Sequence, residues 1–147
     1  MLNRTVVALA LCFSPFTSAF ASESLDLARK GNAAWSAFEC VALASHLKRS
    51  DDQRRLFEFG YKQGLEFIAA IQAGKIERED LSSSVPVGVL FSLEGPTPDF
   101  MLGRMYGSAV DSALEDVFKS GDYFRTESEQ ALAASAKFSD SNCELLG

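Results

Sequence analysis

A single possible disulfide constrains the fold of this chain more than any other feature of its sequence. The 147 residues contain three cysteines. Cys12 lies in an N-terminal segment that we expect to be removed, so Cys40 and Cys143 can pair only with each other. A bridge between them would close a loop of about 100 residues and would stabilise the folded state by about 4–5 kcal/mol on the chain-entropy argument. The alternative is two unpaired thiols, one buried and one at a frayed chain end.

The N-terminus has the pattern of a secretory signal peptide. Met1–Arg4 supplies a short basic start, and Thr5–Phe16 is almost wholly apolar. Ala19 and Ala21 then form an A-x-A cleavage site. We therefore expect residues 1–21 to be a signal peptide and residues 22–147 to form a single helical domain. An exported chain reaches a compartment where disulfides persist. The alternative interpretation of the same segment is an anchor that is not cleaved.

The net charge limits the classes of partner that the chain can bind. The sequence has 14 basic and 20 acidic residues. Since the first 21 residues contain one arginine and no acid, the expected mature chain has a net charge of −7. Such a chain repels phosphate backbones and anionic lipid headgroups, which argues against nucleic-acid and membrane partners. No later stretch approaches the ~18–20 apolar residues of a membrane span. A basic protein would be attracted.

The apolar periodicity predicts an all-α fold, a single-domain bundle of about four to six helices tied by the Cys40–Cys143 disulfide. Helix-start signals are Asn32, Ser50 with Gln53 as a capping box, and Thr97 followed by Pro98. The expected helices cover residues 32–47, 50–73, 97–119 and 126–138, with a lead-in over 22–30 and one more turn over 76–81.

Residues 85–100 admit two interpretations. The alternating apolar residues of Val85–Leu93 resemble a strand, but a lone strand in a helical chain would leave its backbone groups unpaired. A short helix with Pro86 in its first turn avoids that cost. We prefer the helix, and the sequence leaves open whether 85–100 is core or an exposed interaction patch.

Two pairs of glycines four residues apart mark two of the expected helices. Gly60 and Gly64 share one face of the helix 50–73, and Gly103 and Gly107 lie on what we expect to be the inward face of the helix 97–119. Each glycine in a helix costs about 1 kcal/mol relative to alanine, so a close helix contact is the simplest compensation. We expect the two faces to cross closely. The alternative is that each pair faces a different bulky neighbour.

The residues predict no catalytic site, no metal site and no cofactor. The chain has one histidine, His46, and lacks a G-x-S-x-G elbow, a P-loop and a G-x-G-x-x-G motif. Cys40, Cys143 and His46 are too few and too far apart for a metal. We interpret the acidic residues, such as Glu58, Glu66 and Asp111, as parts of solvent-exposed helix faces.

Three residues are candidates for binding. Arg104 is the only basic residue of its expected helix before Lys119 at the helix end, and it suits either a surface ion pair or an anchor for a carboxylate of a partner. Asp99 lies in the first turn of that helix, where the dipole favours an acid. Phe91 is one of the two phenylalanines of the segment 85–100.

We therefore expect an exported, periplasmic or secreted, non-catalytic protein that binds a partner protein, as an inhibitor or an immunity-type protein. In general character it is similar to small periplasmic inhibitors and to helical immunity proteins that neutralise secreted cell-wall amidases. No motif ties individual residues to those proteins. The alternative is a carrier or sensor of a small apolar ligand held between the two glycine-marked helices. The oligomeric state stays open.

Overall fold

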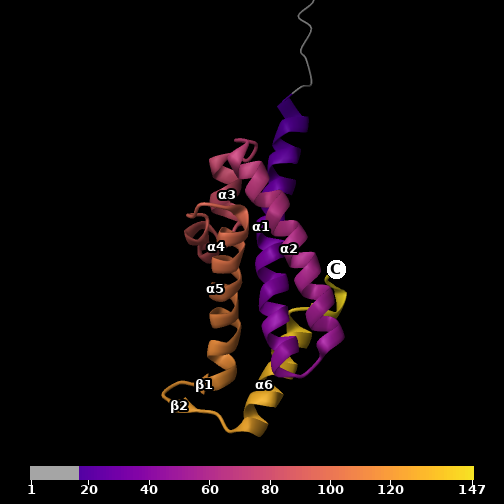
Figure 1. The fold of residues 1–147 in the computed structure, drawn as a ribbon, viewed down its shortest axis with the longest axis vertical. Coiled ribbons are helices and arrows are strands. Elements are labelled where there is room, and N and C mark those ends of the chain that lie inside the picture. The colour runs from indigo at the N-terminus through magenta and orange to yellow at the C-terminus, as the bar shows by residue number, and fades with distance from the viewer. Residues whose placement is uncertain (1–16) are drawn as a thin grey trace, which may run out of the picture.

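A computed structural model describes residues 17–147, and helices make up most of this part of the chain (Figure 1). The predicted all-α single domain is confirmed. The first 16 residues of the predicted signal peptide lie outside the described part, and the boundary at residue 22 stays a prediction. The helices are α1 (Thr17–His46), α2 (Ser50–Gln72), α3 (Arg78–Ser84), α4 (Val87–Ser92), α5 (Pro98–Phe118) and α6 (Glu127–Asp140).

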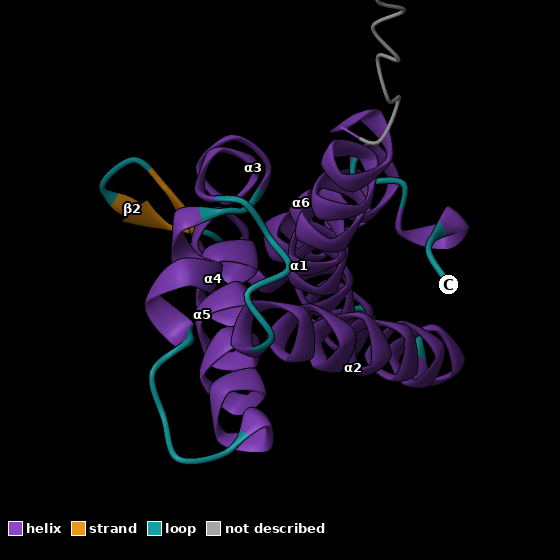
Figure 2. Ribbon diagram, turned by 90° about the horizontal axis from the view of Figure 1, so that it is seen from above, coloured by secondary structure: helices purple, strands orange, loops and turns teal. Residues whose placement is uncertain are grey.

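Helix α1 is the central element of the bundle. Helices α1 and α2 form a long antiparallel hairpin, α5 packs on another side of α1, and α6 returns beneath them (Figures 1 and 2). Between α5 and α6 the chain forms a small antiparallel hairpin of β1 (Lys119–Ser120) and β2 (Tyr123–Phe124). Among the described helices, none combines the length and the apolarity needed to cross a bilayer.

The predicted start of the first long helix at Asn32 is wrong, because α1 is already helical from Thr17 and passes through Gly31 without a break. Gly31 is buried, and a Cβ placed there would lie 2.9 Å from the ring of Phe67 in α2. The absence of a side chain thus lets α2 approach α1 closely. Packing gained along the α1–α2 contact outweighs the poor helix propensity of this glycine.

The core consists of two clusters. One surrounds the disulfide at the α6 end of the bundle, and the other lies toward the α4 end, around Phe38, Phe67 and Met105. The predicted Cys40–Cys143 pair is confirmed: both cysteines are fully buried, and their Cα atoms lie 5.5 Å apart. The bridge joins the middle of α1 to a short 3₁₀ helix, η1 (Cys143–Leu145), so the C-terminus is held against the bundle.

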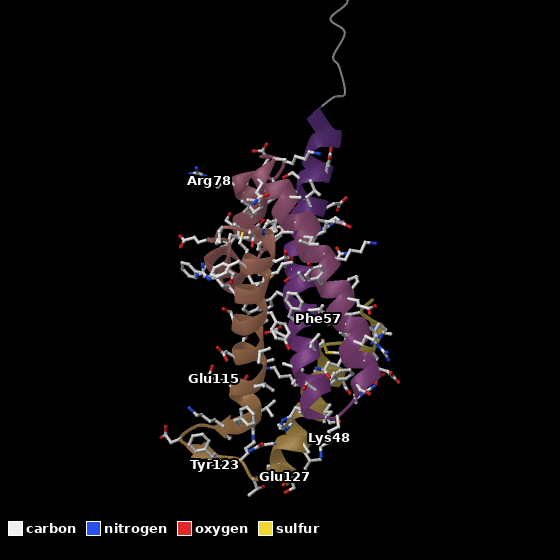
Figure 3. All side chains as sticks on the ribbon, viewed as in Figure 1. Lys48, Phe57, Arg78, Glu115, Tyr123 and Glu127 are labelled. Atoms are coloured by element: carbon white, nitrogen blue, oxygen red, sulfur yellow. A yellow bond between two sulfur atoms is a disulfide. The ribbon has the colours of Figure 1, made fainter. Side chains whose placement is uncertain are left out.

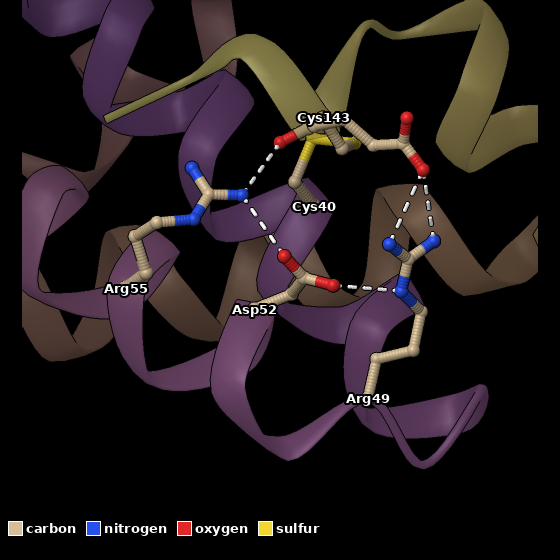
Figure 4. Close-up of a disulfide and its surroundings, with 6 residues drawn as sticks. Cys40, Arg49, Asp52, Arg55 and Cys143 are labelled. Carbon is tan, nitrogen blue, oxygen red and sulfur yellow. Dashed lines mark hydrogen bonds and ion pairs between the residues drawn. A yellow bond between two sulfur atoms is a disulfide. The ribbon is translucent and has the colours of Figure 1, made fainter.

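A charged network covers the disulfide (Figure 4). Arg49 donates to Asp52 at 2.7 Å and to Glu144 at 3.2 Å, while Arg55 donates to Asp52 at 3.1 Å and to the carbonyl of Cys143 at 3.2 Å. The network joins the start of α2 to η1. Arg49 occupies the N-cap position of α2, and no side chain caps this helix end, so the capping box predicted from Ser50 does not form.

The Asp52 carboxylate should make the stability of the protein depend on pH. Its hydrogen bond to Arg55, and then that to Arg49, lowers the pKa of Asp52 below its ordinary value. Its stabilisation is therefore complete above the pKa of about 4 of the unfolded chain and is lost as pH falls through the folded-state value. Urea unfolding of wild type should lose more stability between pH 7 and pH 3 than that of Asp52→Asn. Asp51→Asn is the control, since it removes an acid from the same helix turn. Equal losses in wild type and Asp52→Asn would contradict the assignment.

The segment 85–100 divides between core and surface. It forms the short helix α4, as preferred, with Pro86 at its N-cap. Val85 and Val89 are buried, whereas Val87 and Phe91 are exposed. Helix α5 then begins at Pro98, and the side chain of Thr97 accepts a hydrogen bond from the Phe100 amide at 3.2 Å, as predicted.

Candidate functional site

The main hollow of functional interest lies between α2 and α5. Both helices pack chiefly on α1 and much less on each other. The groove between them is lined by residues of all three helices, with Phe38 and Val41 contributed by α1. At the N-terminal end of α5 the groove deepens into a cavity of about 170 Å³, which we call the aromatic pocket. A second hollow of about 430 Å³ continues the groove toward the start of α2 and shares Phe57 and Tyr106 with the pocket. We call the two hollows together the aromatic groove.

Four aromatic rings from three helices line the pocket. Phe38 of α1 is buried and meets Tyr106 of α5 edge to face, with ring centroids 5.4 Å apart. Phe57 of α2 lies edge to face with Tyr106 at 5.9 Å and stacks on Tyr61 at 6.1 Å. Phe57 lies at mid-height of the bundle (Figure 3) and is 44% exposed, and Tyr61 is 37% exposed. Rings fixed by one another in this way lose little freedom when they bind.

A carboxylate lies at the rim of the pocket. Asp99, in the first turn of α5, accepts a hydrogen bond from the Tyr61 hydroxyl at 2.6 Å, which links α5 to α2 across the groove. The hydrogen bond to the Asp99 carboxylate raises the pKa of Tyr61, so its phenol stays neutral. The pocket therefore combines apolar walls with one negative charge.

The predicted crossing of the two glycine faces does not form. Gly60 lies against Phe38 and Ala37 of α1, and Gly64 lies against Leu102 of α5. Gly103 and Gly107 are exposed, and a Cβ at either would meet nothing within 4 Å. The prediction that these two glycines lie on the inward face of α5 is wrong. The buried stripe of the helix runs beside them, through the residues Leu102, Met105, Ala109, Ala113 and Val117.

Gly103 has a different place from the one expected. It lies in the wall of the aromatic pocket, on the side formed by α5. A side chain at this position would occupy space that is now open, because no protein atom fills it. The glycine thus helps to keep the pocket open, whereas Gly107, one turn further along α5, is not part of its lining.

Of the three binding candidates, only Asp99 lies in the groove. Arg104 donates to the carbonyls of Glu94 at 2.5 Å and Phe91 at 3.0 Å, so it closes the C-terminal end of α4. None of the ion pairs among residues 23–147 involves Arg104, so the expected surface ion pair does not form there, and its binding to a carboxylate of a partner stays a prediction. Phe91 is 74% exposed on α4, apart from the pocket lining.

Sequence reasoning did not assign Phe57, Tyr61 and Tyr106 to a binding site. Phe57 and Tyr61 stand four residues apart, so they share a helix face and stack. That spacing was visible in the sequence but is equally typical of a helix core. Tyr106 carried no signal of its own, since its meeting with α2 depends on the packing of both helices on α1.

Of the other ionisable residues, Glu58 lines the second hollow of the groove, whereas several others have partners elsewhere. Glu66 pairs with Lys30 at 2.6 Å, and Asp116 pairs with Lys137 at 3.4 Å. His46 meets Phe118 edge to face at 5.6 Å. Within the part of the chain that is described, no three His, Cys, Asp or Glu side chains gather closely enough to hold a metal ion.

Comparison with known proteins does not assign the chain to a family. The chain matches no protein-family model, and no curated protein and no solved structure resembles it closely enough to count as a match.

Proposed function

We propose that this protein is exported and binds a partner protein through the aromatic groove, as an inhibitor or immunity-type protein. The observation that carries the proposal is the partly exposed, mutually packed cluster of Phe57, Tyr61 and Tyr106 in a groove. Tyrosine and other aromatic side chains are typical of the centres of protein interfaces, where they supply most of the binding free energy. Exposed apolar surface of this kind is costly unless it serves binding.

Charge supports a basic partner. The expected mature chain has a net charge of −7, and Asp99 adds a negative group at the groove itself. Complementary charge speeds association and selects against acidic competitors. We therefore expect the association rate to fall as salt is raised.

Export is supported by the N-terminal pattern and by the buried disulfide, which persists in oxidising compartments. The proposal expects protein from the periplasmic or secreted fraction to begin at Ser22. Its intact mass should be lower than that of the reduced form by two hydrogens. A product that retains residues 1–21, or that has two free thiols, would overturn the exported state.

The partner site can be tested by photo-crosslinking. We expect p-benzoylphenylalanine at position 57 or 61 to crosslink one defined protein in cells that make this chain. The matched control is the same residue at position 123, since Tyr123 is also an exposed aromatic but lies in the β1–β2 hairpin, away from the groove (Figure 3).

With that partner purified, Phe57→Ala should weaken binding at least tenfold, about 1.4 kcal/mol, as is typical of interface aromatic residues. Tyr123→Ala should leave the dissociation constant unchanged. Equal crosslinking at positions 57 and 123, or equal affinity of the two alanine variants, would overturn the groove as the partner site.

A small apolar ligand is a second candidate function, and the size of the aromatic pocket favours it. The volume of about 170 Å³ is close to that of an apolar cavity that holds a benzene-sized molecule. Native mass spectrometry of freshly purified protein should then show a bound mass of one small molecule. An unliganded mass, even after rapid purification, would count against this function.

A further inference from the structure

The aromatic pocket has a composition suited to a positive charge. Aromatic rings attract cations through the negative faces of their π systems, and such rings are the usual surroundings of bound ammonium and guanidinium groups. Here four rings and the Asp99 carboxylate belong to one hollow. A neutral apolar ligand would use the rings but would leave the carboxylate without a matching charge.

Among the described residues, no basic side chain lines the aromatic pocket. None of the ion pairs found among residues 23–147 involves Asp99. Arg104, the one basic residue of α5, donates its hydrogen bonds to carbonyls at the end of α4. The hydrogen bond from Tyr61 engages the Oδ1 atom of Asp99 and is neutral, so it leaves the negative charge of the carboxylate uncompensated.

The pocket is also open and of suitable size. Its volume of about 170 Å³ accommodates a compact cationic head with part of its alkyl stem. The missing side chain at Gly103 keeps one wall clear, and the buried Phe38 forms the floor. Long-range attraction from the acidic chain raises the local concentration of cations.

We propose that the aromatic pocket binds an arginine or lysine side chain of the partner protein, held between the rings of Phe57, Tyr61 and Tyr106 and paired with Asp99. The inference rests on the proposed function, because it names the group by which the partner is recognised. Its content is a preference for positive charge, which an apolar ligand site lacks.

The preference can be measured without the partner. The probes are capped tripeptides, glycyl-arginyl-glycine and glycyl-lysyl-glycine, and their near-isosteric neutral matches with citrulline and norleucine. Each is titrated into the ¹⁵N-labelled protein at constant ionic strength. We expect saturable shifts of the Gly103, Tyr61 and Tyr106 amides with the cationic probes, and at least fivefold weaker binding of the neutral ones. Equal affinity of charged and neutral probes, or no shift at these residues, would overturn the inference.

One pair of variants locates the site. Gly103→Leu fills the pocket at a position where a side chain meets no protein atom, so the fold should persist. Gly107→Leu is the matched control, since it is equally open on the same helix but outside the pocket lining. Gly103→Leu should lower the affinity for the arginine probe at least fivefold, and Gly107→Leu should leave that affinity unchanged. Equal binding by the two would contradict the site.

Asp99→Asn keeps an acceptor for Tyr61 but removes the charge. We expect its affinity for the arginine probe to fall to that of the citrulline probe, with little change for citrulline. An unchanged arginine preference would overturn the role of Asp99.

The outcomes separate this inference from the proposed function. Crosslinks at position 57 without any preference for charged probes would overturn the cation site and leave the groove as the partner site. Preferential binding of the charged probes without crosslinks at position 57 would overturn partner binding and leave a cation pocket.

Discussion

Reduction of the Cys40–Cys143 disulfide is expected to lower the free energy of unfolding by about 4–5 kcal/mol. The bridge spans 103 positions of the chain, and a closed loop of this size removes much of the conformational entropy of the unfolded chain. Urea unfolding of the oxidised protein and of the same protein kept in dithiothreitol measures the difference. It isolates the cross-link because every atom except the thiol hydrogens is retained.

The double variant Cys40→Ala/Cys143→Ala serves as the control for the sulfur atoms. Both cysteines are fully buried in the cluster with Leu43, Leu56 and Phe138. Their truncation should therefore add a cavity cost to the loss of the bridge, which makes the variant less stable than the reduced protein. If oxidised and reduced protein unfold at the same urea concentration, the disulfide does not hold the C-terminus as described here.

Gly60→Leu is expected to destabilise the protein by about 3 kcal/mol, in spite of the better helix propensity of leucine. A Cβ at position 60 would lie 2.9 Å from the Phe38 ring and 3.0 Å from the Cβ of Ala37, so a leucine side chain would push α2 away from α1. Chemical denaturation of the variant and of wild type would measure the change.

The same substitution at the second glycine, Gly107→Leu, is expected to change the stability in the opposite direction. Position 107 is exposed with no neighbour within 4 Å, so the variant should gain about 0.5–1 kcal/mol from helix propensity alone. The pair therefore tests the assignment of the glycine faces. The assignment would be wrong if Gly60→Leu raised the free energy of unfolding. It would also be wrong if Gly107→Leu lowered the free energy of unfolding as much as Gly60→Leu does.

Local signals predicted most helices because local chemistry decides them. Thr97 accepts from the amide of Phe100 at the start of α5, and Thr126 forms a capping box with Glu129 at the start of α6. The signals failed where long-range packing was stronger. The expected helix start at Asn32 is wrong because α1 continues through Gly31, where the ring of Phe67 occupies the space that the missing side chain leaves.

The candidate site was less accessible to sequence reasoning. Asp99 was identified from its place near a helix start, and Gly103 from its spacing to Gly107, but neither pattern indicates which surface lies opposite. Arg104 was noticed because it is isolated in its helix, whereas its hydrogen bonds go to carbonyls ten and thirteen residues away. Such contacts depend on how α4 folds back on α5.

The residues by themselves determined the helical class, the ends of several helices and the single disulfide pairing, because periodicity, capping and the number of available cysteines are properties of the chain alone. Tertiary structure alone decided which face of α5 is buried and where Phe57, Tyr61 and Tyr106 meet. A glycine in the sequence indicates that a close contact is possible, but the packing of the helices decides which residue lies against it. The groove exists because α2 and α5 each bury their apolar stripe on α1, and the space left between them follows from that shared packing.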